Sequence, residues 1–109
     1  MSEWEVGPHD VKKRLDDRAD FLLLDVRTAE ELEIAAISGA THLPLHELDA
    51  NHPTLAGWQE KEVVCLCHHG GRSEMAQQYL MRNGFKNVKN FVGGINAWAL
   101  EVDGDMATY

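Results

Sequence analysis

The sequence has few cysteines and no long apolar run, and these absences exclude several classes of protein. Two cysteines in 109 residues are too few for the disulfide framework that small secreted domains use in place of a large core. No apolar run approaches the roughly 18–20 residues that a membrane-spanning helix needs. The opening MSEWEVGPHD lacks the basic stretch and apolar core of a secretory signal. We therefore expect a cytoplasmic protein with free thiols and no membrane partner.

Basic residues are also scarce, with 10 Lys and Arg against 18 Asp and Glu, which gives a formal net charge of −8. This balance argues against a nucleic-acid partner, because nucleic acids are held by a broad basic face. A small positive pocket is still compatible with an acidic surface, so an anionic substrate would need a local site. We expect residues 1–109 to form a single domain, since two domains would each have too small a core.

Short apolar runs predict the strands of the fold. The three strongest candidates are Phe21–Leu24, Val63–Cys67 and Val88–Val92. The first two are almost continuously apolar, which is typical of a parallel sheet that is covered on both faces. Two weaker strand candidates are Trp4–Val6 and Thr41–Leu43.

Helical patterns alternate with these strands. Pro8 precedes an amphipathic turn, and Thr28 and Glu31 have the spacing of a capping box. Further apolar stripes follow Ser73 and the Gly93–Gly94 pair. The alternation predicts an α/β fold with a mostly parallel sheet. We expect the stretch HELDANHPTLAGWQEKE to form a short helix and a surface loop, and the polar tail DGDMATY to fray.

The stretch LCHHGGRS combines a thiol with several hydrogen-bond donors. It places Cys67 at the carboxyl end of a predicted strand, with a helix opening near Ser73. Ligands of open α/β sheets bind at this edge, and a helix N-terminus presents free N–H groups to them. The helix, Arg72, and His68 or His69 when protonated can lower the pKa of a thiol. The loop is therefore suited to hold a thiolate.

The two glycines in this stretch support the same interpretation. We expect Gly70 and Gly71 to adopt positive φ and to turn backbone N–H groups toward the sulfur, which would stabilise an anion there. Cys67 is therefore the candidate nucleophile, whereas Cys65, inside the apolar run, is assigned to the core. The cluster CLCHH lacks the second, separated ligand pair of a structural zinc site. We expect no metal and no other cofactor.

At these residues the chain resembles the rhodanese-like domain family of sulfurtransferases. The markers are LLLDVRTAEE, ISGATHLP, CHHGGRS and NGFKNVKNFVGGINAW, in this order between Val6 and Val102. The resemblance implies a three-layer α/β fold, with a central, mostly parallel five-stranded sheet flanked by helices. It also implies that Cys67 takes a sulfane sulfur from a small anionic donor such as thiosulfate, becomes a persulfide and passes the sulfur to a thiophilic acceptor.

The resemblance also implies roles for other residues. The backbone from Cys67 to Arg72 would cradle the persulfide, and Asp25 and Arg27 would support this loop by hydrogen bonds. The chain departs from many members in having Ala35 and Ala36 where they have a Gly–His pair, which leaves the substrate preference open. The substrate-binding residues would be His68, His69, Gly70, Gly71, Arg72 and Ser73.

Three functions are compatible with the sequence. An enzyme would turn over small sulfur compounds in a ping-pong reaction through the Cys67 persulfide. A carrier or docking module would form the same persulfide and deliver its sulfur to a partner protein. A phosphatase or arsenate reductase would share the thiolate cradle, but related cell-cycle phosphatases place five residues between cysteine and arginine. Here four residues separate Cys67 from Arg72, which favours sulfur transfer.

Overall fold

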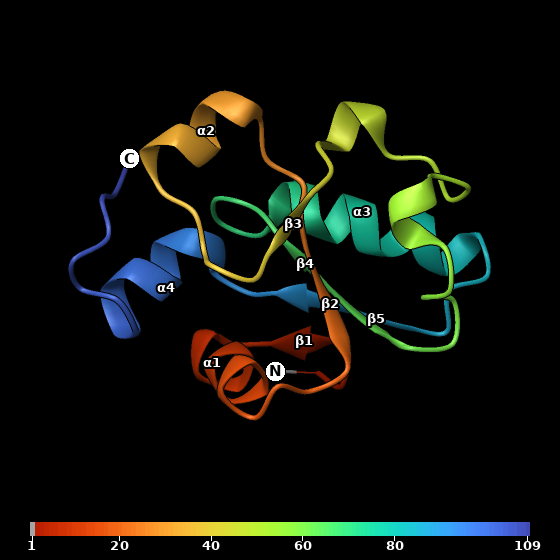
Figure 1. Cartoon of the computed structure of the whole chain (residues 1–109), viewed down its shortest axis with the longest axis horizontal. Helices are drawn as coiled ribbons and strands as arrows, with labels where there is room; N and C mark the ends of the chain where they lie inside the picture. Colours follow the sequence, from red (N-terminus) through yellow and green to blue (C-terminus); the bar gives the residue numbers. More distant parts are fainter. Residues whose placement is uncertain (1) are drawn as a thin grey trace.

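The computed structural model describes residues 2–109 and arranges them as a sheet between two layers of helices (Figure 1). Each expected strand is present, with ends that differ by at most one residue from those predicted. In chain order the elements, with η for 3-10 helices, are β1 (Glu5–Val6), α1 (Pro8–Asp16), β2 (Phe21–Asp25), α2 (Ala29–Ile34), β3 (Thr41–His42), η1 (Leu45–Glu47), η2 (Pro53–Leu55), β4 (Glu62–Leu66), α3 (Gly71–Arg82), β5 (Asn87–Phe91) and α4 (Gly94–Glu101).

The five strands form one sheet in the order β1-β5-β4-β2-β3, and every neighbouring pair is parallel. The expected α/β fold with a five-stranded parallel sheet is confirmed. β4 is the central strand, and its partners β2 and β5 run alongside it in the same direction. The carboxyl ends of these strands therefore meet at one edge of the sheet, where β4 leads into Cys67.

Both faces of the sheet are buried, which explains why β2 and β4 are apolar at successive positions. Side chains alternate between the faces along each strand. Leu24 and Cys65 pack with Leu80 of α3 in one core cluster. Leu23 and Val64 belong to the other cluster, which includes residues of α1 and α4.

The helix ends differ partly from the sequence prediction. The capping box before α2 is confirmed, since Glu31 N donates to Thr28 Oγ1 at 3.3 Å and Thr28 N donates to Glu31 Oε1 at 3.2 Å. α3 begins at Gly71, two residues before Ser73, because Gly70 has a φ of +129° and turns the chain into the helix. The irregular stretch after β3 forms two 3-10 helices rather than one short helix.

The longest helix, α3, has 12 residues. Among residues 2–109, none of the helices has the length and apolar character needed to cross a bilayer.

Candidate active site

Cys67 lies directly after the central strand β4, in the turn that leads into α3. Its side chain is 1% exposed and belongs to the core cluster that also contains Cys65. The sulfur nevertheless has polar partners, because Gly70 N donates to Cys67 Sγ at 3.0 Å and Ser73 Oγ lies 3.4 Å from it. In residues 2–109 the Gly70 amide is the one backbone donor on this sulfur, in place of the expected collar of amides.

The two loop glycines differ from each other. Gly70 has the expected positive φ, whereas Gly71 does not and is the first residue of α3. The helix therefore begins early enough to place Arg72 and Ser73 in its first turn, where free N–H groups and the positive end of the helix dipole lie. The sequence pattern did not distinguish the two glycines, because either could have supplied the turn.

Asn90 of β5 forms hydrogen bonds to the loop and to the start of α3. The sequence analysis did not identify this residue. Its side chain is 5% exposed. Asn90 Nδ2 donates to the carbonyl oxygen of Gly70 at 3.3 Å, and Ser73 Oγ bonds to Asn90 Oδ1. Ser73 Oγ also lies 3.0 Å from Gly70 O. The available signal was an asparagine inside a predicted buried strand, next to Phe91.

The N-terminus of α4 fixes the other side of the loop. Ile95 N donates to the carbonyl oxygen of Cys67 at 2.9 Å, and Asn96 N donates to that of His68 at 3.1 Å. These bonds use N–H groups that a helix leaves without partners in its first turn. They give both loop carbonyls a partner, and they require the Gly94 backbone to lie against the loop.

Arg72 does not point to the loop as a free cation. Its guanidinium forms two hydrogen bonds with the carboxylate of Glu31 in α2, at 2.5 and 2.9 Å. These bonds hold the pKa of Glu31 far below its usual range, although partial burial acts against the shift. Glu31 thus has a second role besides capping α2. The sequence indicated only the capping role, because Glu31 and Arg72 are 41 positions apart.

Asp25 and Arg27 form a buried ion pair, with side chains that are 1% and 0% exposed and a shortest distance of 2.7 Å. The hydroxyl of Tyr109 connects this pair to the loop. Arg27 Nη1 donates to that hydroxyl at 3.0 Å, and the hydroxyl donates to Glu31 Oε2 at 2.6 Å. A series of hydrogen bonds therefore links Arg27 to Arg72 through Tyr109 and Glu31.

Comparisons with known proteins agree with this geometry. The sequence model of the family described as "Rhodanese-like domain" matches residues 7–101. The chain belongs to the rhodanese-like domain family.

Individual relatives of this rhodanese-like domain are similar over most of its length. A sulfurtransferase of Allochromatium vinosum is 37% identical over 95 residues, which cover 87% of each chain. The adenylyltransferase and sulfurtransferase MOCS3-2 of Zea mays is 41% identical over 103 residues, which cover 90% of this chain and 21% of the maize protein. The chain thus spans about a fifth of the length of the maize relatives that it matches.

A solved structure, the thiosulfate sulfurtransferase of Pseudomonas aeruginosa, superposes with a TM-score of 0.79 at 28% identity. The match covers 88% of this chain and 18% of that one. A protein of Bacillus subtilis described as "Putative sulfur carrier protein YrkF" is also similar, with 37% identity over 94 residues that cover 86% of this chain and 50% of that protein.

In this rhodanese-like domain, Tyr109 covers part of the loop that runs from Cys67 to Arg72. Its ring stacks on His68, with centroids 3.8 Å apart and planes inclined by 6°, and the ring of His69 lies 3.9 Å from that of His68. The expectation that the tail frays was wrong. The sequence DGDMATY is polar, but Met106 packs against a core cluster and Tyr109 finds partners on the loop.

The stack changes the acid–base behaviour of His68. Burial lowers the pKa of His68, and the charge of a protonated His69 lowers it further. His68 Nε2 is buried and has no hydrogen-bond partner in the described residues, which fits a neutral ring. The lowered pKa favours a neutral His68 at neutral pH, so His68 does not supply the charge that its protonated form would bring to the loop.

Replacing Tyr109 with alanine is expected to raise the pKa of His68 toward its ordinary value of about 6.5, because the ring that buries the imidazole is removed. NMR titration of the His68 ring protons would measure this. The wild type should lose stability as the pH falls below about 6.5, since the folded state disfavours protonation of His68, and Tyr109→Ala should lose less. A Tyr109→Phe variant, which keeps the stack, should leave the pKa of His68 lowered. An unchanged pKa in Tyr109→Ala would contradict this account.

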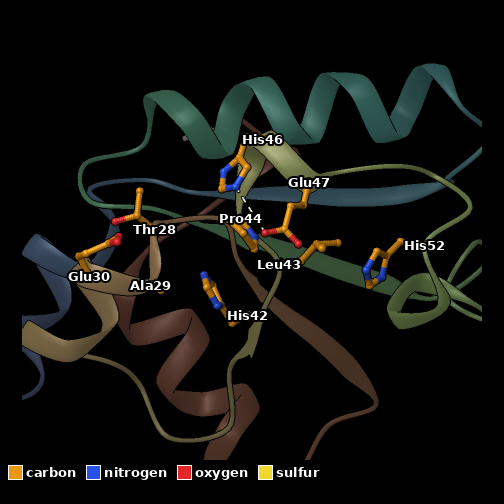
Figure 2. A pocket seen from close by; sticks show the side chains of 9 residues that line it. All are labelled: Thr28, Ala29, Glu30, His42, Leu43, Pro44, His46, Glu47 and His52. Carbon is orange, nitrogen blue, oxygen red and sulfur yellow. Dashed lines mark ion pairs between the residues drawn. The ribbon is translucent and has the colours of Figure 1, made fainter.

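Two hollows that share part of their lining lie near α2 and β3, and one of them reaches Arg72. Arg72 lines the smaller one, of about 260 Å³, together with Thr28, Pro44 and His46. The larger one, of about 410 Å³, shares the last three of these residues. Figure 2 shows its lining, which includes three histidines and two glutamates: His42, His46, His52, Glu30 and Glu47.

The histidines of this hollow have different partners. His42 Nε2 bonds to the carbonyl oxygen of Arg27 at 2.7 Å, and His52 Nδ1 accepts the N–H of Thr54 at 3.1 Å. His46 Nε2 lies 3.4 Å from the Glu47 carboxylate. Within residues 2–109, no group of three or more His, Cys, Asp and Glu side chains could hold a metal ion. The smaller hollow, which Arg72 lines, offers room for a molecule that approaches the loop.

Proposed function

We propose that this domain transfers sulfane sulfur through a persulfide on Cys67. The observation that carries the proposal is the position of Cys67 Sγ, 3.0 Å from the Gly70 amide in the turn before α3. An N–H donor and the positive end of a helix dipole both stabilise negative charge on sulfur, as a thiolate or a persulfide. The family of the domain supports the same chemistry.

The first half-reaction is a nucleophilic displacement at sulfur. With thiosulfate, the Cys67 thiolate attacks the outer sulfur, the sulfur–sulfur bond of thiosulfate breaks, and sulfite leaves with the bonding electron pair. Cys67 then carries a persulfide. In the second half-reaction an acceptor nucleophile attacks the terminal sulfur, and the Cys67 thiolate is the leaving group. Passing through a covalent intermediate divides one transfer into two simpler displacements.

Roles for the other residues follow from their contacts. We assign Gly70 and Ser73 to the sulfur that they contact, and Gly71 to the first turn of α3. We assign His68, His69 and Arg72, which lie in the loop and at the start of α3, to binding of the donor. Asp25 and Arg27 support the loop through Tyr109 and Glu31.

The wild-type protein is expected to gain the mass of one sulfur atom when it is incubated with a sulfane donor and to lose it when cyanide or a thiol is added. Intact mass spectrometry before and after the acceptor measures both steps. A sulfur gain that small acceptors remove quickly supports an enzyme. A stable gain that only a partner protein removes supports a carrier. A protein that gains no sulfur from any sulfane donor, yet hydrolyses an aryl phosphate, would contradict the proposal.

A further inference from the structure

The charge of Arg72 is compensated before any donor arrives. Both guanidinium bonds to Glu31 are short, and the two side chains are 35% and 16% exposed. The carboxylate is far enough from water to remain an effective countercharge. Thiosulfate carries two negative charges and approaches a thiolate that carries one, so it needs an uncompensated cation near the sulfur.

Glu31 is not free to swing away when a donor binds. Its carboxylate accepts hydrogen bonds from the Tyr109 hydroxyl at 2.6 Å and from Thr28 N at 3.2 Å, in addition to those from Arg72. Its pKa, held far below the usual range mainly by the bonds from Arg72, shows that it is charged at neutral pH. A dianion that displaced Glu31 from Arg72 would have to break this network.

Two other basic groups near the loop, Arg27 and His68, are also compensated or neutral. Arg27 is paired with Asp25 in the protein interior. His68 lies between the rings of His69 and Tyr109, and burial lowers its pKa. Burial keeps Arg27 away from a donor, and a neutral His68 offers it no charge.

We propose that Glu31 sets the donor selectivity of the loop, favouring an alkyl persulfide over thiosulfate by neutralising Arg72. This inference rests on the proposed function of Cys67. An alkyl persulfide carries at most one negative charge at its reacting end, and its leaving group is a thiolate rather than a dianion. The Cys67 thiolate attacks the outer sulfur of R–S–S–H, the sulfur–sulfur bond breaks, and the products are Cys67–S–S–H and RS⁻.

Replacing Glu31 with glutamine tests the proposal. Glutamine can retain the hydrogen bonds of the capping box while it removes the negative charge. We expect Glu31→Gln to raise the rate constant for loading of Cys67 from thiosulfate about tenfold relative to that from hydroxyethyl persulfide. Rapid quenching and intact mass spectrometry give both rate constants at several donor concentrations.

Glu33 offers a matched control on the same helix. It is exposed, and Glu33→Gln changes the net charge by the same amount. We expect its ratio of the two rate constants to stay within about twofold of the wild type, because surface charges are screened. If Glu31→Gln does not fold, Tyr109→Phe removes one of the bonds that hold Glu31 and should shift the ratio in the same direction, by about threefold.

The outcomes separate the two proposals. An unchanged ratio in Glu31→Gln, or a parallel fall of both rate constants, overturns the role of Glu31 while the sulfur loading itself stands. If neither donor loads Cys67 in the wild type, the proposed function fails. Persulfidated serum albumin serves as a third donor. Loading from albumin indicates that a protein persulfide can be the sulfur source. Loading from hydroxyethyl persulfide alone indicates a small-molecule persulfide. Both results support selectivity for a persulfide over thiosulfate.

Discussion

Replacing Cys67 with serine is expected to lower sulfur loading by at least about 1,000-fold, since a hydroxyl is a far weaker nucleophile than a thiolate at neutral pH and forms no persulfide. The fold should persist, because serine is similar in size and can accept the Gly70 N–H that now bonds to the sulfur. Intact mass spectrometry after exposure to a sulfane donor measures the effect directly.

Cys65 supplies the matched control for this experiment. Burial, together with the negative charge of Cys67, raises the pKa of Cys65 to about 12, so it stays a thiol at neutral pH. It is 0% exposed and packs in the same core cluster as Cys67. A Cys65→Ala variant should therefore load one sulfur atom as the wild type does. Retained loading in Cys67→Ser, or its loss only in Cys65→Ala, would move the nucleophile away from Cys67.

Replacing Gly94 with alanine should damage both stability and activity. A Cβ there would overlap the carbonyl oxygen of Cys67 and lie 2.5 Å from that of His68. The φ of +54° adds strain for any residue with a side chain. We expect a loss of about 3 kcal/mol of unfolding free energy and a fall in melting temperature of about 15 °C. Displacing the loop by an ångström should also lower sulfur loading about 100-fold.

A Gly57→Ala variant serves as the control that separates backbone strain from the clash between a Cβ at position 94 and the loop. Gly57 has a φ of +85°, but a Cβ there would meet nothing within 4 Å. Gly57→Ala therefore measures the backbone strain alone, which we expect to cost about 1 kcal/mol without a change in sulfur loading. Chemical denaturation and the mass-spectrometric loading assay should be applied to both variants. Equal effects of the two substitutions would show that close packing of α4 against the loop is unimportant.

The sequence predicted the elements well because their causes are local or periodic. Strands that are buried on both faces have to be continuously apolar, and this made β2 and β4 visible as runs. The capping box of α2 depends on two residues three positions apart, Thr28 and Glu31. The position of Cys67 followed from the parallel arrangement, which brings strand ends to one edge.

The charge environment of the loop could not be predicted in the same way. Arg72 looks like a free cation in the sequence, and its partner is 41 residues away on a different helix. The stack of Tyr109 on His68 joins two segments that share no pattern, and the polar composition of the tail suggested fraying instead. Contacts of this kind depend on the tertiary arrangement of side chains, which no local or periodic sequence pattern records.

The position of Tyr109 next to the loop has a consequence for engineering this domain. A thiol joined after Tyr109 by a short flexible linker would start beside His68, at an effective concentration near the millimolar range relative to the loop. Parallel strands place the beginning of β1 at the opposite edge of the sheet, so cargo attached before Glu5 would have to reach around the molecule (Figure 1). Fusions that accept the sulfur of the Cys67 persulfide should therefore be attached after Tyr109, and purification tags before Glu5.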